Sequence, residues 1–201
     1  MILSGEDIKR YDLLLDADPK NMQAQGWDVR LDKVYRVVNK PYGEKIKEEV
    51  DYVGPYKILV EDFNKTWGNS GLCNYICQIW NKDGILSYYI PPNFSVLFKL
   101  METVDLRPRR EYCQGSLENI GYFNAYVLPK SSLSRRGVIV HSAWWDAGYK
   151  GSGVVLVRTS EVPLQIKPGD AFGQMIFYEG SSTGSVYNGQ YQGEGLAGRK
   201  V

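Results

Sequence analysis

The chain has 201 residues, of which 43% are hydrophobic, and its 24 Lys and Arg nearly balance its 23 Asp and Glu. This composition suits one hydrophobic core rather than a disordered chain, and a net charge of +1 argues against a protein that wraps nucleic acid through global charge. No stretch approaches the roughly 20 consecutive apolar residues of a membrane-spanning helix. We therefore expect neither a nucleic-acid nor a membrane partner.

The opening residues and the cysteines indicate in which cellular compartment the protein is expected. MILSGEDIKR has neither the basic start nor the long apolar stretch of a secretory signal. Cys73, Cys77 and Cys113 are odd in number and lack the paired spacing of a zinc site. We expect a cytoplasmic protein with structural thiols.

The first elements along the chain are a helix and a strand. Ser4 can cap a short amphipathic helix over 5–15, in which Ile8 and Tyr11 recur at helical spacing. In WDVRLDKVYRVV (27–38), apolar and charged residues alternate with the period of a half-buried strand.

The next stretch is irregular and then turns into a hairpin. Residues 39–65 mix charged residues with Gly and Pro turns around a short strand, KILVEDF (57–63), so we expect this part at the periphery or at a subunit contact. ICQIW (76–80) and ILSYYI (85–90) flank an Asn-Lys-Asp-Gly turn, which predicts a β-hairpin.

Short apolar segments separated by Gly, Pro and Asp follow to the end of the predicted core. They are FSVLFKLMETVDL (94–106), YFNAYVL (122–128), GVIVHSAWW (137–145), GVVLVRT (153–159), VPLQI (162–166) and AFGQMIFYE (171–179). Together with 15 Tyr, five Trp and 21 Gly, they predict an all-β fold, a distorted barrel or jelly roll, with a short N-terminal helix. We expect one domain over 1–180 and a flexible arm over 181–201, which is rich in Gly, Ser and Tyr and poor in aliphatic residues.

Two clusters carry candidate chemistry. PKSSLSRRG (129–137) combines cations, hydroxyls and backbone N–H groups, which suits a triphosphate, although a basic Ser-rich turn explains it as well. SAWWDAGYKG (142–151) places Asp146 after an apolar strand, where a carboxylate can take a proton from water, bind a sugar hydroxyl or satisfy the backbone of its own turn. Tyr149 can stack under a sugar or base.

These clusters carry a family resemblance. PKSSLSRRG resembles the second motif of the trimeric dUTPase and dCTP deaminase superfamily, and WDAGYKG (145–151) is similar to its third. AQGWD (24–28) resembles the first motif, KPGDAFGQ (167–174) the fourth and YNGQYQG (187–193) the mobile C-terminal arm, all in the family's order. Residues 39–110 match no motif, and we interpret them as an insertion or a family-variable region.

The strand after the third motif bears on the reaction. Superfamily deaminases carry a Glu there, in a pattern like Gly-x-Ile-x-Leu-Glu, whereas this chain has Leu156 at about that position and no carboxylate between Asp146 and Glu161. The sequence therefore favours a dUTPase, which cleaves dUTP to dUMP and pyrophosphate. A dCTP deaminase, a bifunctional dCTP deaminase/dUTPase and a non-catalytic nucleotide-sensing protein on the same fold are the alternatives.

The resemblance also implies roles for single residues. Asp146 would position and deprotonate the attacking water, Gln174 would orient phosphate or water, and Asp28 would hold hydrated Mg²⁺. The implied substrate-binding residues are Lys130, Ser131, Ser132 and Arg135 for the phosphates, Ala143 for uracil, Tyr149 for the deoxyribose, and Tyr191 and Arg199 on the arm. A homotrimer with sites at subunit boundaries is implied too. His141, the only histidine, follows an apolar run, and we expect it to be packed in the core or hydrogen-bonded.

Overall fold

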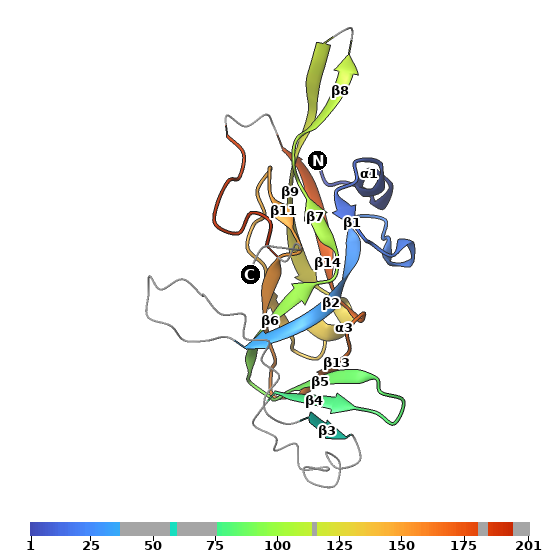
Figure 1. Cartoon of the computed structure of the whole chain (residues 1–201), viewed down its shortest axis with the longest axis vertical. Helices are drawn as coiled ribbons and strands as arrows, with labels where there is room; N and C mark the ends of the chain where they lie inside the picture. The colour runs from blue at the N-terminus through green and yellow to red at the C-terminus, as the bar shows by residue number, and fades with distance from the viewer. Residues whose placement is uncertain (37–56, 60–75, 114–115, 181–184, 195–201) are drawn as a thin grey trace.

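The protein is built almost entirely of β-strands (Figure 1). The computed structural model describes residues 1–36, 57–59, 76–113, 116–180 and 185–194. Its helical elements are α1 (Gly5–Arg10), the 3-10 turn η1 (Pro19–Asn21) and α3 (Ser131–Ser134). The strands are β1 (Leu14–Leu15), β2 (Trp27–Arg36), β3 (Lys57–Leu59), β4 (Cys77–Trp80), β5 (Leu86–Ile90), β6 (Ser95–Leu100), β7 (Thr103–Asp105), β8 (Arg109–Cys113), β9 (Ser116–Pro129), β10 (Ile139–His141), β11 (Lys150–Gly151), β12 (Val154–Arg158), β13 (Leu164–Ile166) and β14 (Ala171–Gly180).

The strands form three sheets. Seven strands make the main sheet in the order β10-β12-β6-β2-β14-β9-β8, and the smaller sheets run β1-β7-β11 and β13-β5-β4-β3. In Figure 1, β8 and the adjoining part of β9 project from one end of the molecule, and the sheet that contains β3, β4 and β5 lies at the other. The sheets curl into a nearly closed barrel, so the predicted all-β, barrel-like fold with a short N-terminal helix is confirmed.

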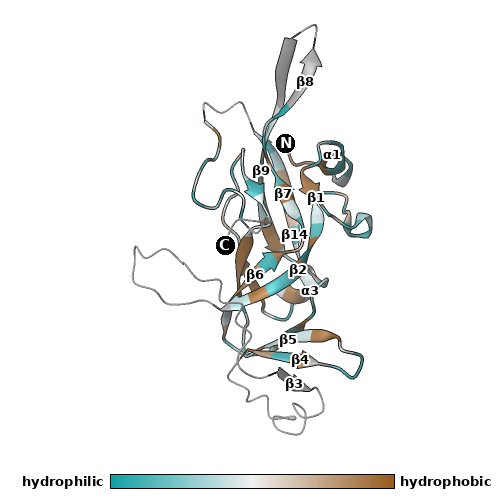
Figure 2. Cartoon of the chain, viewed as in Figure 1, coloured by the Kyte–Doolittle hydropathy of each residue, from teal (hydrophilic) through white to brown (hydrophobic). Residues whose placement is uncertain are grey.

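The core lies between the inward faces of the curled sheets. On β2, Trp27, Val29 and Leu31 are buried as predicted, but the alternation is not kept throughout, because Asp28, Val34 and Tyr35 are buried too. The rings of Phe98 and Phe172, both fully buried, meet edge to face with centroids 5.2 Å apart. Figure 2 shows hydrophobic stretches within the strands and a hydrophilic turn between β4 and β5.

The N-terminal helix is shorter than the predicted 5–15. Ser4 caps it in a capping box: its Oγ accepts from Asp7 N, and its own N–H donates to Asp7 Oδ2, each over 3.1 Å. The helix ends at Arg10 because the next residues are used elsewhere: Leu14 and Leu15 pair with β7. Helical spacing of apolar residues does not reveal that competing strand pairing.

The predicted hairpin over 76–90 is confirmed. β4 and β5 pair antiparallel, and Asn81 Oδ1 accepts from the backbone N–H groups of Asp83 and Ile85 in the turn. Gly84 has φ +73°, a conformation that favours glycine. Cys77 on β4 is buried, as expected for a structural thiol.

The predicted strand 94–106 is instead two strands that join different sheets. The break coincides with Glu102, which is fully buried and binds Arg30 twice: Oε1 accepts from Arg30 Nε over 2.7 Å, and Oε2 from Arg30 N over 2.9 Å. Burial raises the pKa of Glu102, and the Arg30 hydrogen bonds oppose that rise. The ion pair therefore fixes the point where the chain leaves β6 of the main sheet and enters β7.

Several sequence predictions fall in or beside parts that the structure does not describe. Cys73 and most of 39–65 lie outside the described residues, apart from β3 (Lys57–Leu59). β6 and β7 fall within 39–110 and pair with strands on both sides of that region. The proposed domain boundaries at 39–110 and 180 stay predictions. Among the described helices, none is long and apolar enough to cross a membrane.

The buried ion pair yields a stability prediction. Replacing Arg30 with Met leaves the Glu102 carboxylate buried without its charged partner, so the free energy of unfolding falls by about 3–5 kcal/mol. Urea unfolding at neutral pH measures the loss. The matched control is Lys99→Met, which removes a partly exposed pair with Asp32 (2.9 Å) and costs about 1 kcal/mol or less. Equal losses in the two variants would contradict the role assigned to Glu102.

Candidate active site

Asp28, Lys130 and Gln174 are far apart in the sequence and are brought together by the pairing of β2, β14 and β9. Gln174 on β14 lies directly opposite Asp28 on β2 and opposite Leu128 on β9, so the three positions form one row across the sheet. Lys130 follows the end of β9, and its Nζ lies 2.8 Å from Asp28 Oδ2. The first, second and fourth motifs are thereby brought together in one chain.

The serines of the second motif sit on α3, directly after Lys130. The backbone N–H of Lys130 donates to Phe172 O over 3.0 Å, and the buried Leu133 anchors the short helix to the core. Ser131, Ser132 and Arg135 are exposed. Their hydroxyl and guanidinium groups are therefore accessible to an anion beside Lys130.

Asp146 lies on the loop 142–149 between β10 and β11, which we call the Asp146 loop. It is exposed, whereas Trp145 before it is buried and exchanges two backbone hydrogen bonds with Ala125 of β9, of 2.8 and 3.0 Å. The N–H of Ala147 donates to Asn124 Oδ1 over 3.0 Å. The loop is thus fixed on both sides of a carboxylate that faces solvent.

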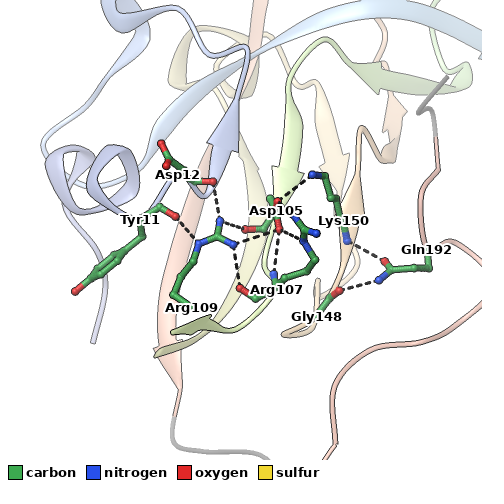
Figure 3. A network of polar contacts seen from close by, with 8 residues as sticks. All are labelled: Tyr11, Asp12, Asp105, Arg107, Arg109, Gly148, Lys150 and Gln192. Carbon is green, nitrogen blue, oxygen red and sulfur yellow. Dashed lines mark hydrogen bonds and ion pairs between the residues drawn. The ribbon is translucent and has the colours of Figure 1, made fainter. Parts of the chain in front are cut away.

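The C-terminal arm packs on the Asp146 loop. Tyr187 N donates to Ala147 O over 2.7 Å and Gly193 N to Lys150 O over 2.8 Å. Gln192 bridges the loop end: its Oε1 accepts from Lys150 N and its Nε2 donates to Gly148 O (Figure 3). Gly148 has φ +98°, and a Cβ there would lie 2.7 Å from Val186 Cβ, so the close approach of the arm requires glycine.

Tyr149 is enclosed between the loop and the arm. Its ring lies 5.4 Å from that of Trp145 and 5.8 Å from that of Tyr187, and only 6% of the residue is exposed. Burial raises the pKa of Tyr149, and the negative charge of Glu194 on the arm adds to the effect. A sugar that packs on this ring must first displace the arm.

The two groups of candidate residues are separated within one chain. Trp145, the residue before Asp146, pairs with Ala125 of β9. Lys130 follows Ala125 by five residues, which corresponds to about 16 Å along a strand. No hydrogen bond or ion pair among the described residues joins Asp146 to Asp28, Lys130 or Gln174.

Among the other predicted site residues, Ala143 lies on the Asp146 loop and Tyr191 on the arm. Ala143 and Tyr191 are both exposed, and Arg199 lies outside the described residues. The roles assigned to all of these residues by resemblance stay predictions.

In the row formed by Asp28, Gln174 and Leu128, the carboxylate of Asp28 is the group that could bind a metal ion. Its Oδ2 accepts from Lys130 Nζ and, over 3.3 Å, from Gln23 Nε2. The described side chains contain no group of three or more His, Cys, Asp or Glu that gathers around one point. This donor set fits a hydrated Mg²⁺ that takes most of its ligands from water and phosphate, and it does not fit a full protein cage.

Of the two alternatives for His141, a place in the core is wrong, and the sequence did not reveal several other residues. His141 is exposed because β10 is an edge strand of the main sheet. Asp105 was read as part of an apolar strand, although it is a buried carboxylate that binds Lys150. Gln192 and Glu194 stand in or beside the arm motif, but only the fold shows that they contact the Asp146 loop.

Comparisons with known proteins identify a family model and relatives that this chain resembles. A model of the dCTP deaminase-like family matches residues 2–180. A dUMP-forming dCTP deaminase of Sulfurihydrogenibium is 26% identical over 96% of this chain and 93% of its own length. A probable deoxyuridine 5'-triphosphate nucleotidohydrolase of Methanopyrus kandleri is 26% identical over 95% of this chain and 99% of its own.

Other similarities are partial. A probable deoxyuridine 5'-triphosphate nucleotidohydrolase of Aeropyrum pernix is 39% identical over 35% of this chain, and the chain spans less than half, 46%, of that relative. Among solved structures, the 2'-deoxycytidine 5'-triphosphate deaminase of Agrobacterium tumefaciens matches with a TM-score of 0.50 and 18% identity, over 88% of this chain and 48% of its own. That likeness concerns the fold.

The docked arm predicts a pH dependence. Burial raises the pKa of the Glu194 carboxyl from its ordinary 4.5 to about 7, and Lys99 opposes the rise. Because the docked arm binds this proton more tightly than the free arm, docking is strongest at low pH and weakens as the pH rises from about 4.5 to about 7. Chymotrypsin cleavage after Tyr191, measured relative to an unfolded reference peptide, should therefore be faster at neutral than at mildly acidic pH.

The control for this effect is Glu194→Gln. The amide does not titrate, so its relative cleavage rate should be the same across the pH range. A pH-dependent rate in the variant equal to that of the wild type would assign the effect to another group.

Proposed function

This chain belongs to the dCTP deaminase-like family, and on that premise we propose that it hydrolyses dUTP to dUMP and pyrophosphate. Family members are enzymes named both as dUTP nucleotidohydrolases and as dCTP deaminases. The choice between these reactions depends on which groups face the pyrimidine ring and which face the phosphates.

The observation that carries the proposal is the side chain at position 156. Leu156 lies on β12 between Leu97 of β6 and His141 of β10, where the deaminase pattern has a Glu. Attack of water on the cytosine ring needs a group that accepts and returns protons, and an aliphatic side chain does neither. Hydrolysis at phosphorus needs no proton-transferring group at position 156.

The phosphates would bind around Asp28, Gln174 and the neighbouring Lys130. Lys130 supplies an ammonium group, and the exposed Ser131, Ser132 and Arg135 on α3 add donors beside it. Gln174 donates through Nε2 to Gln25 O over 2.6 Å, which fixes its amide in the row. Mg²⁺, held through water by Asp28, would neutralise charge on the phosphate oxygens.

The attacking water would be activated by Asp146. The carboxylate is exposed on a loop fixed by Ala125 and Asn124, so it is free to orient water without moving its backbone. The proton passes from water to the carboxylate as oxygen attacks the α-phosphorus and pyrophosphate leaves.

A complete site of this kind would need more than one copy of the chain. Asp146 is separated from Lys130 within one chain, so a neighbouring copy would have to supply one of the two groups. An exposed aromatic surface supports such an assembly: Trp144 is 52% exposed and lies 6.0 Å from Tyr126 and 5.5 Å from Tyr178, measured between ring centroids. We propose the homotrimer implied by the family resemblance.

Deamination of dCTP is the second candidate, and one observation favours it. Glu194 on the arm has a pKa of about 7 and interacts with Lys99, which lies directly across from Val154 of β12. A carboxyl group with that pKa suits proton transfer at neutral pH. The arm would then supply the acid that β12 lacks.

A panel of nucleotides distinguishes these functions. The protein is incubated with Mg²⁺ and dUTP, dCTP or dTTP, and the products are resolved by chromatography with separate assays for pyrophosphate and ammonia. We expect dUMP and pyrophosphate from dUTP. Ammonia from dCTP would establish deamination, and binding without any product would indicate a nucleotide sensor.

The role of Asp146 is tested by Asp146→Asn. The amide cannot take the proton from water, so turnover of dUTP falls by about 10²–10⁴-fold, while the fold and nucleotide binding are kept because the side chain is exposed. Steady-state kinetics and equilibrium binding measure the two effects. Asp83→Asn makes the same change in the exposed turn between β4 and β5 and should leave turnover unchanged. Full activity in Asp146→Asn would remove the residue from the mechanism.

A further inference from the structure

Asp105 is a buried carboxylate that binds three cations. It lies on β7 with 3% of its surface exposed. Arg107 donates to it twice, over 2.8 and 2.6 Å, and Lys150 Nζ and Arg109 Nη1 lie 3.1 and 3.5 Å from its oxygens (Figure 3). Burial alone would raise the pKa of Asp105, but the hydrogen bonds from Arg107 and Lys150 lower it to about 2. The group is therefore charged at neutral pH.

Two of the cations connect Asp105 to other parts of the chain. Arg109 donates to the carbonyl oxygens of Tyr11 (2.6 Å) and Asp12 (2.8 Å), which follow α1. Lys150 stands directly opposite Asp105 in the pairing of β11 with β7. One carboxylate thus joins the end of the N-terminal helix to the end of the Asp146 loop.

Lys150 is also where the C-terminal arm attaches. Its N–H donates to Gln192 Oε1 over 2.9 Å, and its carbonyl accepts from Gly193 N over 2.8 Å. The backbone of Lys150 is therefore held by the arm while its side chain is held by Asp105. A displacement of β11 would weaken both attachments.

We propose that Asp105 is a positioning residue that keeps the Asp146 loop and the docked arm in place through Lys150. The effect of Asp105 on the loop and the arm is independent of the proposed function, and only its kinetic consequence rests on that function. Without the carboxylate, three cations would stand close together in a partly buried place, and their repulsion would drive Lys150 away from β7. The loop end that carries Tyr149 and receives Gln192 would lose its support.

The test is hydrogen exchange of the arm in the nucleotide-free protein. Asp105→Asn and Lys150→Met are compared with the wild type over residues 185–194 by mass spectrometry. Exchange should be faster by about tenfold or more in both variants, the change expected for one lost charge-assisted hydrogen bond. If Asp105→Asn fails to fold, Lys150→Met carries the test, because it leaves Arg107 and Arg109 bound to Asp105.

The matched control is Glu102→Gln. Glu102 is equally buried and lies three residues before Asp105, but it binds Arg30 and not the loop. This variant should lose stability and keep the wild-type exchange of the arm. Equal acceleration in all three variants would show general destabilisation, and wild-type exchange in both Asp105→Asn and Lys150→Met would overturn the proposal.

Kinetics give a second readout. Because the loop end that carries Tyr149 loses its support in Asp105→Asn, KM for the nucleotide should rise with a smaller change in kcat, whereas a loss of folded protein would lower the apparent kcat alone. The exchange result does not depend on which nucleotide is turned over. Failure of the proposed function and failure of this inference are therefore distinguishable.

Discussion

The register of β14 between β2 and β9 is the constraint on which the phosphate end of the proposed site depends. Asp28, Lys130 and Gln174 are far apart in the sequence, and only this antiparallel pairing brings them together. The register shifts between Ala171 and Gly173, where a Cβ on Gly173 would lie 2.5 Å from Val127 Cγ1. A larger residue at 173 would push β14 away from β9, and the contact between Lys130 and Asp28 would be lost with the pairing.

The sugar end of the proposed site depends on a competition for Tyr149. The arm covers this ring with Tyr187 and is attached to the backbone of Ala147, Gly148 and Lys150. A nucleotide that packs on Tyr149 therefore has to replace contacts that the arm already makes. If protonation of Glu194 favours docking and Asp105 holds the loop end through Lys150, the charge of two carboxylates affects how easily the arm is released.

The sequence revealed patterns that repeat locally or occur in a fixed order. Alternation over 27–38, the Asp-Gly turn and five ordered motifs were enough to predict the β-fold, the hairpin and the family. It did not reveal pairings that depend on distant strands, which ended α1 at Arg10 and divided 94–106 at Glu102. Asp105 was overlooked for the same reason, because a single acid in an apolar segment has no visible partner until Arg107, Arg109 and Lys150 converge on it.

Attack of water on the α-phosphorus of dUTP, as proposed for this protein, is tested most directly by isotope transfer. The protein turns over dUTP in water enriched in ¹⁸O, and the products are weighed by mass spectrometry. Attack at the α-phosphorus places the label in dUMP and leaves pyrophosphate unlabelled. Label in pyrophosphate, or intact dUTP alongside release of ammonia from dCTP, would contradict the proposed reaction.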